Sequence, residues 1–320
     1  MRYIVLFFAV LFSLRFLFSQ DAVLSQYNSF PLYTNMAMAG SKGCSRVVMG
    51  TRLQWLNVDG GYKTYYFSYD QYSMHLNSGL GFEYYRNDEA DRLMISDVLH
   101  LSLSPHFPVG RKTDSLGKLV IKPAINFGYL QNIRDTNVVY GDVIDPVYGF
   151  IFNTQDVAGI SKIQSTDFGA GAMLYGQSFY AGIYFHHLTS ASIGLGYDVL
   201  PIYTRMTIQS GYVLRDSAII GKFSIMPSFI YERQGGSDRL DLTLYARYRK
   251  FSLGTSLRLN RTMVLLMGFS HKIIKLGYSY EVNRLSTRKF FGTTHEINMS
   301  VNVAYRKERK KIRTLDFINE

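Results

Sequence analysis

Cysteine is almost absent from this sequence of 320 residues. The single thiol, Cys44, can form no disulfide within the chain, and beside Gly43 in a turn-like stretch it is not expected to be a nucleophile or a ligand. Beyond the N-terminal region, no apolar run approaches the roughly 18 residues that a membrane-spanning helix requires. No linker rich in Pro and Gly divides the chain. These absences exclude a disulfide scaffold and a helical membrane protein, and they favour a single domain.

Motifs of catalysis and metal binding are also missing. The seven histidines show no His-x-x-x-His spacing, and neither a Gly-x-Ser-x-Gly elbow nor a phosphate loop is present. His186 and His187 are adjacent in an expected strand, so their side chains should point to opposite faces and cannot easily share one ion. We therefore expect no enzyme activity, no catalytic residue, no cofactor and no metal. A minor hypothesis is an outer-membrane hydrolase that uses His187, although a polar residue at a loop edge is the preferred interpretation.

The chain has little acidic charge for its size, and its formal net charge is +11 with a pI near 9.5. A basic protein raises the question of nucleic acid, but the positive residues are spread over strands and loops rather than gathered in one stripe. We therefore expect no nucleic acid partner, and favour a polar lumen and contact with anionic lipids. One cluster of positive charge stands out near the C-terminus: Arg306, Lys307, Arg309, Lys310 and Lys311. It is interpreted as a solvated tail or as a periplasmic interface with headgroups or an acidic partner.

The N-terminus has the features of a secretory signal peptide. Arg2 precedes an almost wholly apolar run from Ile4 to Phe18, and a small residue, Ser19, precedes a polar start. Residues 1–19 are therefore predicted to be a signal peptide with cleavage after Ser19. Residues 20–44 are predicted to form an N-terminal segment that lies either in the periplasm or as a plug.

From about residue 45 to residue 305 the sequence alternates apolar and polar side chains. Near the C-terminus, Ile297, Met299, Val301 and Val303 alternate with Glu296, Asn298, Ser300 and Asn302. Side chains alternate faces along a strand, so this segment has one apolar and one polar face. The 25 tyrosines and 22 phenylalanines suit aromatic girdles where a membrane meets water. The pattern predicts an all-β fold: a transmembrane antiparallel β-barrel in the outer membrane.

We predict fourteen strands, an even number as expected for such barrels, with twelve to sixteen possible. They cover residues 45–55, 62–71, 76–87, 93–105, 118–130, 166–176, 178–188, 201–214, 220–234, 237–248, 250–259, 262–271, 273–283 and 294–306. With the N-terminus in the periplasm, long connections fall mostly outside and short turns mostly inside, as in known barrels. The barrel domain is thus predicted over 45–306, followed by a basic periplasmic tail at 307–320. A soluble β-sandwich is the alternative fold, but its strands would be shorter.

Several ordered patches are similar to those of the PorP/SprF family, outer-membrane proteins of the type IX secretion system of Bacteroidetes. The start Ser25-Gln26-Tyr27 and the stretch from Asn35 to Ser41, with Gly40, resemble the family's "SQY…NPAYAGS" signature. The next patch holds Arg52, Gln54, Trp55, Asp59 and Gly60. The last holds Gly277 to Tyr280, then His295 and Glu296. Met36 and Gly61 stand where the family usually has Pro, and the basic tail exceeds the usual ending.

The resemblance implies a non-enzymatic outer-membrane component of type IX secretion, or of the surface attachment of secreted adhesins of the gliding-motility type. It implies two protein partners besides outer-membrane lipids: a periplasmic ring lipoprotein and an adhesin cargo with a C-terminal sorting domain. The extracellular connections 131–165, 189–200 and 284–293 would engage cargo. The patch residues are interpreted as structural or interface residues, and Arg52, Gln54 and Asp59 chiefly as hydrogen-bonding groups of the lumen or loops. The alternative function is a passive porin or a fatty-acid transport barrel, since about fourteen strands could enclose a pore.

Overall fold

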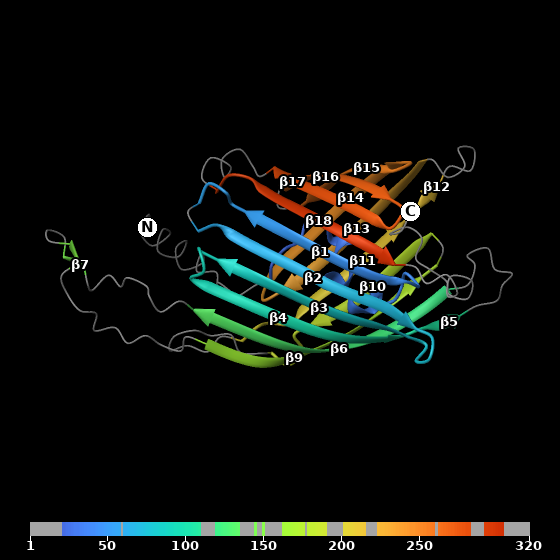
Figure 1. The fold of residues 1–320 in the computed structure, drawn as a ribbon, viewed down its shortest axis with the longest axis horizontal. Coiled ribbons are helices and arrows are strands. Elements are labelled where there is room, and N and C mark those ends of the chain that lie inside the picture. Colours follow the sequence, from blue (N-terminus) through green and yellow to red (C-terminus); the bar gives the residue numbers. More distant parts are fainter. Residues whose placement is uncertain are drawn as a thin grey trace, which may run out of the picture.

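The computed structural model describes residues 21–58, 60–109, 119–134, 144–145, 149–150, 162–176, 178–190, 201–215, 223–259, 262–282 and 291–303. Its main feature is one antiparallel sheet that closes on itself, because β11, the first strand in its order, also pairs with β13, which precedes the short last strand β12. In the described residues, no helix is long and apolar enough to cross a membrane. The sheet is a closed barrel of fourteen strand positions (Figure 1). The predicted fold is confirmed.

The strands follow one another around the barrel in chain order, and their bounds lie close to the predicted ones. They are β1 (Ser45–Gln54), β2 (Tyr62–Ser73), β3 (Ser78–Glu89), β4 (Met94–Pro105), β5 (Phe107–Val109), β6 (Leu119–Arg134), β9 (Lys162–Tyr175), β10 (Phe179–His186), β11 (Arg205–Tyr212), β12 (Leu214–Arg215), β13 (Phe223–Gln234), β14 (Ser237–Tyr248), β15 (Phe251–Arg258), β16 (Thr262–His271), β17 (Ile274–Val282) and β18 (Thr294–Val303). The short β5 and β12 continue β4 and β11 after brief interruptions, and β7 (Ile144–Asp145) and β8 (Gly149–Phe150) form a separate two-stranded sheet.

The two ends of the barrel differ in the length of their connections. One end, called here the long-connection end, carries the connections 135–161 and 187–204. The opposite end, the short-turn end, carries two-residue turns at 249–250 and 272–273. Short turns on one side and longer loops on the other are the usual arrangement in outer-membrane barrels.

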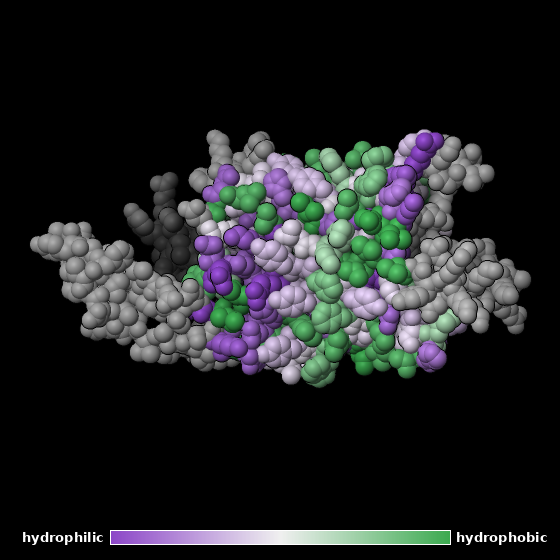
Figure 2. Space-filling model, in the orientation of Figure 1, coloured by the Kyte–Doolittle hydropathy of each residue, from purple (hydrophilic) through white to green (hydrophobic). Residues whose placement is uncertain are grey.

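The outer face of the wall is apolar. On β18, Ile297 is 55% exposed, whereas its inward neighbours Glu296 and Asn298 are 1% and 4% exposed. The same alternation holds on β14, where Leu242 and Leu244 are exposed and Asp241 and Thr243 are buried. Figure 2 shows the apolar side chains gathered over the middle of the wall and toward the short-turn end, with polar side chains toward the long-connection end. A polar inside and an apolar outside fit a barrel that is solvated by lipid.

Residues 21–44 lie inside the barrel and are called here the interior segment. They form three short helices, η1 (Tyr27–Ser29), α2 (Pro31–Thr34) and η2 (Met36–Met38). Pro31 opens α2, where its missing N–H is not needed, and the Asn35 side chain caps η2 by accepting from the Ala37 N–H at 2.8 Å. The segment supplies much of the buried apolar surface, including Leu24, Phe30, Leu32, Tyr33 and Met36, each at most 2% exposed.

The tyrosines are distributed differently from the girdle prediction. Seven are among the least exposed residues of the molecule. One is Tyr27 of the interior segment, and six belong to the interior apolar clusters: Tyr33, Tyr66, Tyr85, Tyr175, Tyr180 and Tyr184. Tyr33 makes edge-to-face contacts with Tyr66 and Tyr85 at centroid distances of 6.1 and 5.2 Å. Composition alone assigned these rings to the membrane interface, and for these seven that was wrong. They fill the space between the wall and the interior segment.

Candidate functional site in the barrel interior

The interior segment approaches the wall closely where two glycines meet. Gly40 has a φ of +64°, and a Cβ on Gly79 of β3 would lie 1.8 Å from the Ala39 carbonyl oxygen. No side chain fits at Gly79, so the backbone of the segment lies directly on the backbone of β3. Beside this contact the Gly40 N–H donates to Asp70, whose carboxylate also binds the buried Arg46 guanidinium at 2.7 and 3.0 Å. A paired charge on the wall thus fixes the end of the interior segment.

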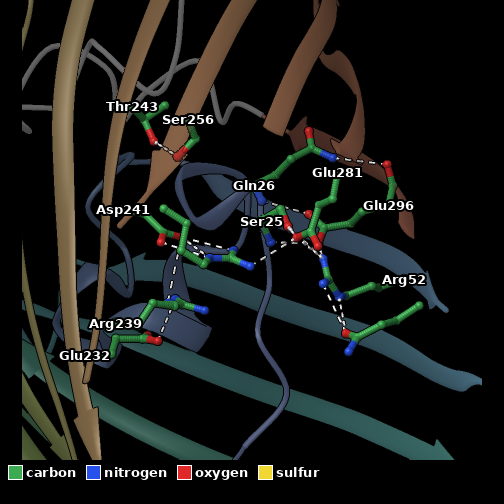
Figure 3. Close-up of polar contacts among 12 residues, drawn as sticks. Ser25, Gln26, Arg52, Glu232, Arg239, Asp241, Thr243, Ser256, Glu281 and Glu296 are labelled. Carbon is green, nitrogen blue, oxygen red and sulfur yellow. Dashed lines mark hydrogen bonds and ion pairs between the residues drawn. The ribbon is translucent and has the colours of Figure 1, made fainter. Parts of the chain in front are cut away.

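A first charged group, shown in Figure 3, joins the start of the interior segment to β1, β17 and β18. Glu296 accepts from the backbone N–H groups of Ser25 and Gln26 at 2.8 and 2.9 Å. Arg52 lies 2.9 Å from Glu281 and 3.4 Å from Glu296. It also donates to the Ser25 hydroxyl at 2.7 Å. All five residues are buried, and none is more than 4% exposed.

The charged group continues along the wall toward β13 and β14 (Figure 3). Arg258 binds Asp241 at 3.0 Å and approaches Glu281 at 3.5 Å. Arg239 in turn binds Glu232 at 2.5 Å. Asp241 and Arg258 are directly opposed in the register of β14 and β15, and Glu232 and Arg239 are opposed in that of β13 and β14. Opposite charges thus face one another across neighbouring strands, which favours this register.

A second charged group holds Asp21, the first described residue, near the long-connection end. The Asp21 carboxylate lies 2.9 Å from His187 Nε2 and 3.0 Å from the Arg205 guanidinium. His187 Nδ1 lies 2.9 Å from Asp167 of β9, and Asp167 also contacts His100 at 3.1 Å. The strands β4, β9 and β11, the residue that follows β10 and the start of the interior segment therefore share one continuous chain of charged and imidazole groups.

The environment of His187 shifts its ionisation. Burial alone would lower the pKa of His187, but the neighbouring carboxylates of Asp21 and Asp167 raise it to about 9. Burial alone would raise the pKa of Asp21, but His187 and Arg205 hold it well below its usual range. At neutral pH this contact is therefore an ion pair between an imidazolium and a carboxylate.

The strand prediction was wrong at His187. β10 ends at His186, and His187 has a φ of +58°, which turns the chain out of the extended conformation. Both imidazoles are consequently buried, at 2% and 1% exposure, with ring centroids 6.2 Å apart, instead of pointing to opposite faces. His187 stands at the edge of the connection 187–204, as predicted, and there it contacts the carboxylates of Asp21 and Asp167.

The structure brings together four of the residues singled out in the sequence: Gln26, Arg52, Gln54 and Glu296. The Arg52 guanidinium donates to Gln54 at 3.1 Å, and the Gln26 amide donates to the Glu296 carbonyl at 3.2 Å. Glu281, at the centre of the same group, was assigned only to the polar face of its strand. Its inward position on β17 was visible in the alternation, but its partner Arg52 lies 229 residues away in the chain.

The remaining singled-out residues lie elsewhere. Tyr27 binds Ser228 through its hydroxyl at 2.8 Å, while Asn35 and Gly40 shape the interior segment. Trp55 packs against Tyr62 and Phe291 at the long-connection end. Gly60 has the positive φ expected of it, +73°, and His295 lies on the outer face beside Tyr278 and Tyr280. Asp59, the signal peptide 1–19 and the tail cluster Arg306, Lys307, Arg309, Lys310 and Lys311 lie outside the described residues, as do most of the connections predicted to engage cargo.

The two charged groups are suited to holding the interior segment against the barrel wall. The carboxylates of both charged groups face arginines or histidines, and no group of three or more metal-ligating side chains gathers within the described residues. A cavity of about 150 Å³ remains between the interior segment and the wall, lined among others by Asn28, Val213, Met226 and Tyr245. The interior segment therefore occupies the lumen at the level of these groups and is bound to the wall on several sides.

The family of the chain follows from its sequence as a whole. The model of the family described as "Type IX secretion system membrane protein PorP/SprF" matches residues 17–301. The chain belongs to this family. Its fold and its closed wall are those of an outer-membrane barrel, and its partners belong to the type IX secretion system. The family description implies a membrane component of that system and no enzymatic role.

Other comparisons add the following. This PorP/SprF member has no match among the curated proteins. Among solved structures it is similar to the toluene transporter TbuX of Ralstonia pickettii, with 12% identity, a TM-score of 0.44, and coverage of 86% of this chain and 92% of that one. The monoaromatic hydrocarbon channel CymD has 11% identity and a TM-score of 0.48, and the match covers 87% of this chain and 93% of that one. The KdgM porin has 9% identity and a TM-score of 0.35, with coverage of 81% of this chain and 99% of that one.

Proposed function

We propose that this PorP/SprF protein is a non-enzymatic anchor in the outer membrane, where it attaches secreted adhesins with a C-terminal sorting domain to the cell surface. The family match over residues 17–301 carries the proposal. The connections 131–165, 189–200 and 284–293 engage the cargo outside. The turns of the opposite end and the basic tail face a ring lipoprotein in the periplasm.

The filled lumen supports an anchor over a passive porin. The interior segment is bound to β18 through Glu296, to β2 through Asp70 and to β11 through Arg205. A segment that is tied to widely separated strands braces the wall and leaves little room for solute. Rigid walls are suited to presenting loops in fixed positions, since binding sites are commonly loops held by a rigid scaffold.

Deleting the gene tests the proposal. We expect the surface-attached adhesin to be lost from the deletion strain and to be recovered when the full-length chain is supplied again, as measured by surface labelling of intact cells. A second strain carries a chain in which residues 136–160 are replaced by a short Gly-Ser linker. It should assemble a barrel, seen as a heat-dependent gel shift, yet leave the adhesin unattached. Unchanged surface adhesin and unchanged gliding in the deletion strain would contradict the proposal.

A further inference from the structure

The inner face of the wall carries small residues side by side from β13 to β18. One inward row crosses these strands, each member directly opposed to the next in the register: Ser224, Arg247, Ser252, Gly268, Gly277 and Asn298. A Cβ on Gly268 would lie 2.3 Å from the Ser252 hydroxyl oxygen, and a Cβ on Gly277 would lie 2.5 Å from Asn298 Nδ2. The middle of the row therefore has no bulky side chain, and the inner cavity of about 150 Å³ lies above it.

The lining of this cavity is positively charged. Its described residues include no Asp or Glu but four cations: Lys42, Arg46, Arg247 and Lys275. Arg46 binds the Asp70 carboxylate at 2.7 Å, which compensates its charge. Arg247 donates to the Arg249 carbonyl oxygen at 3.3 Å, and this neutral acceptor leaves the charge of the guanidinium in place. The lining thus attracts an anionic group.

The positive side chains lie at the short-turn end. Arg247 precedes the turn 249–250, and Ser270 and Lys275 flank the turn 272–273, where they oppose each other in the register. All three are half-buried, whereas Asn298, farther from the turns, is 4% exposed. The strands from β13 to β18 are paired without a break at this level, so they separate the cavity from the bilayer. A ligand therefore enters from the aqueous side at the short-turn end.

The deep side of the cavity offers a hydrogen-bond donor. Asn298 lines it, and the buried Asn298 Nδ2 has no hydrogen-bond partner within the described residues. Buried polar groups normally have a partner, because leaving one without is costly. Hydroxyl groups of the lining, those of Ser252 and Ser300 among them, add further donors. Positive charge combined with hydrogen-bond donors is the chemistry that recognises a carboxylate.

We propose that this cavity binds an acidic peptide segment of a periplasmic partner, with one carboxylate directed at Arg247, Lys275 and Asn298. The periplasmic side of the partner rests on the proposed function, which places the short-turn end there. A peptide is favoured over a single small anion because the positive charge of the sequence continues beyond the cavity. β18 ends at Val303 on this side, and the cluster that starts at Arg306 follows three residues later.

Peptide binding to the purified full chain in a non-ionic detergent tests the site. The probe is a fluorescein-labelled peptide of alternating Glu and Gly, and fluorescence anisotropy measures its affinity. We expect Lys275→Gln to weaken binding about tenfold, because the carboxylate loses a charged donor. The matched control is Lys272→Gln, which removes the same charge from the exposed turn 272–273 outside the cavity and should weaken binding only slightly. Ser252→Phe, which fills the cavity and leaves the charge unchanged, should abolish the effect of Lys275→Gln and weaken binding by itself.

Three results would overturn the proposal. Equal weakening by Lys275→Gln and Lys272→Gln would show attraction to the whole end of the barrel. Displacement of the peptide by an equal concentration of inorganic phosphate would indicate a site for small anions. Binding that appears only in a chain ending at Lys311 would assign the cavity to residues 312–320 of the same chain.

The two lysine variants decide even if Ser252→Phe does not assemble, as judged by the heat-dependent gel shift. Surface adhesin in cells plays no part in this measurement. Absence of peptide binding in a chain that still attaches adhesin would remove the peptide site alone. Loss of the proposed function would instead appear as unchanged surface adhesin in the deletion strain.

Discussion

At the residue scale, buried charges hold the interior segment in place. Arg52 faces Glu281 and Glu296 while both carboxylates are almost fully enclosed. Removing one partner of a buried pair leaves the other charge without compensation, which typically costs about 3–5 kcal/mol. The polar face of each strand was predictable from the alternation. Which inward charge meets which could not be predicted, because Arg52 and Glu281 are joined only when the barrel closes.

Replacing Arg52 tests whether the buried charges stabilise the barrel with its interior segment. We expect Arg52→Ala to lower the free energy of unfolding in detergent by about 3–5 kcal/mol, measured from the urea midpoint and slope. The reason is that the buried Glu296 loses its arginine, while Glu281 keeps the more distant Arg258 at 3.5 Å. The matched control is Lys63→Ala. Lys63 pairs with Asp91 at 3.6 Å in an exposed position, so its loss should change the free energy by less than about 1 kcal/mol. Similar losses for the two variants would show that Arg52 contributes no more than a surface residue.

At the element scale, strands and interior segment follow different rules. The fourteen strand positions were predicted within a few residues because a period of two is visible in the sequence. The short helices of the interior segment give no such signal, since four residues cannot form an amphipathic repeat. The sequence therefore left the periplasmic and plug positions open for residues 20–44. His187 shows a related limit, because a single residue with positive φ turned the chain out of its expected strand.

The contact of the interior segment with His187 should depend on pH. The pKa of His187 is raised to about 9 by Asp21 and Asp167, so its protonated form stabilises the bound segment. That contribution is complete below the ordinary imidazole pKa of about 6.5 and is lost as pH rises through about 9. A spin label at Ala22→Cys in a Cys44→Ser background should therefore become more mobile between pH 8 and pH 10.

The control for this titration is His187→Gln. In that variant the label should be mobile at pH 7 already and show no further transition, because the imidazolium is absent. A transition on the acid side, or an identical alkaline transition in the His187→Gln chain, would rule out the His187 contact as the cause.

At the scale of the whole molecule, the family and the occupied lumen both favour an anchor. The PorP/SprF match covers residues 17–301, and the interior segment inside the wall is tied to strands on several sides of the barrel. A barrel of fourteen strands lies between the filled eight-stranded and the open sixteen-stranded barrels, so its size alone does not exclude a pore. Closure therefore depends on the interior segment, and this is the central claim that separates an anchor from a porin.

Single-channel conductance in planar bilayers tests that claim most directly. We expect the full chain to show no stable open step, and the chain lacking residues 22–43 to show large, lasting steps, with a heat-dependent gel shift confirming that both barrels assemble. If the shortened chain does not assemble, the recording of the full chain is sufficient. Stable, large open steps in the full chain would contradict a closed lumen and favour the porin.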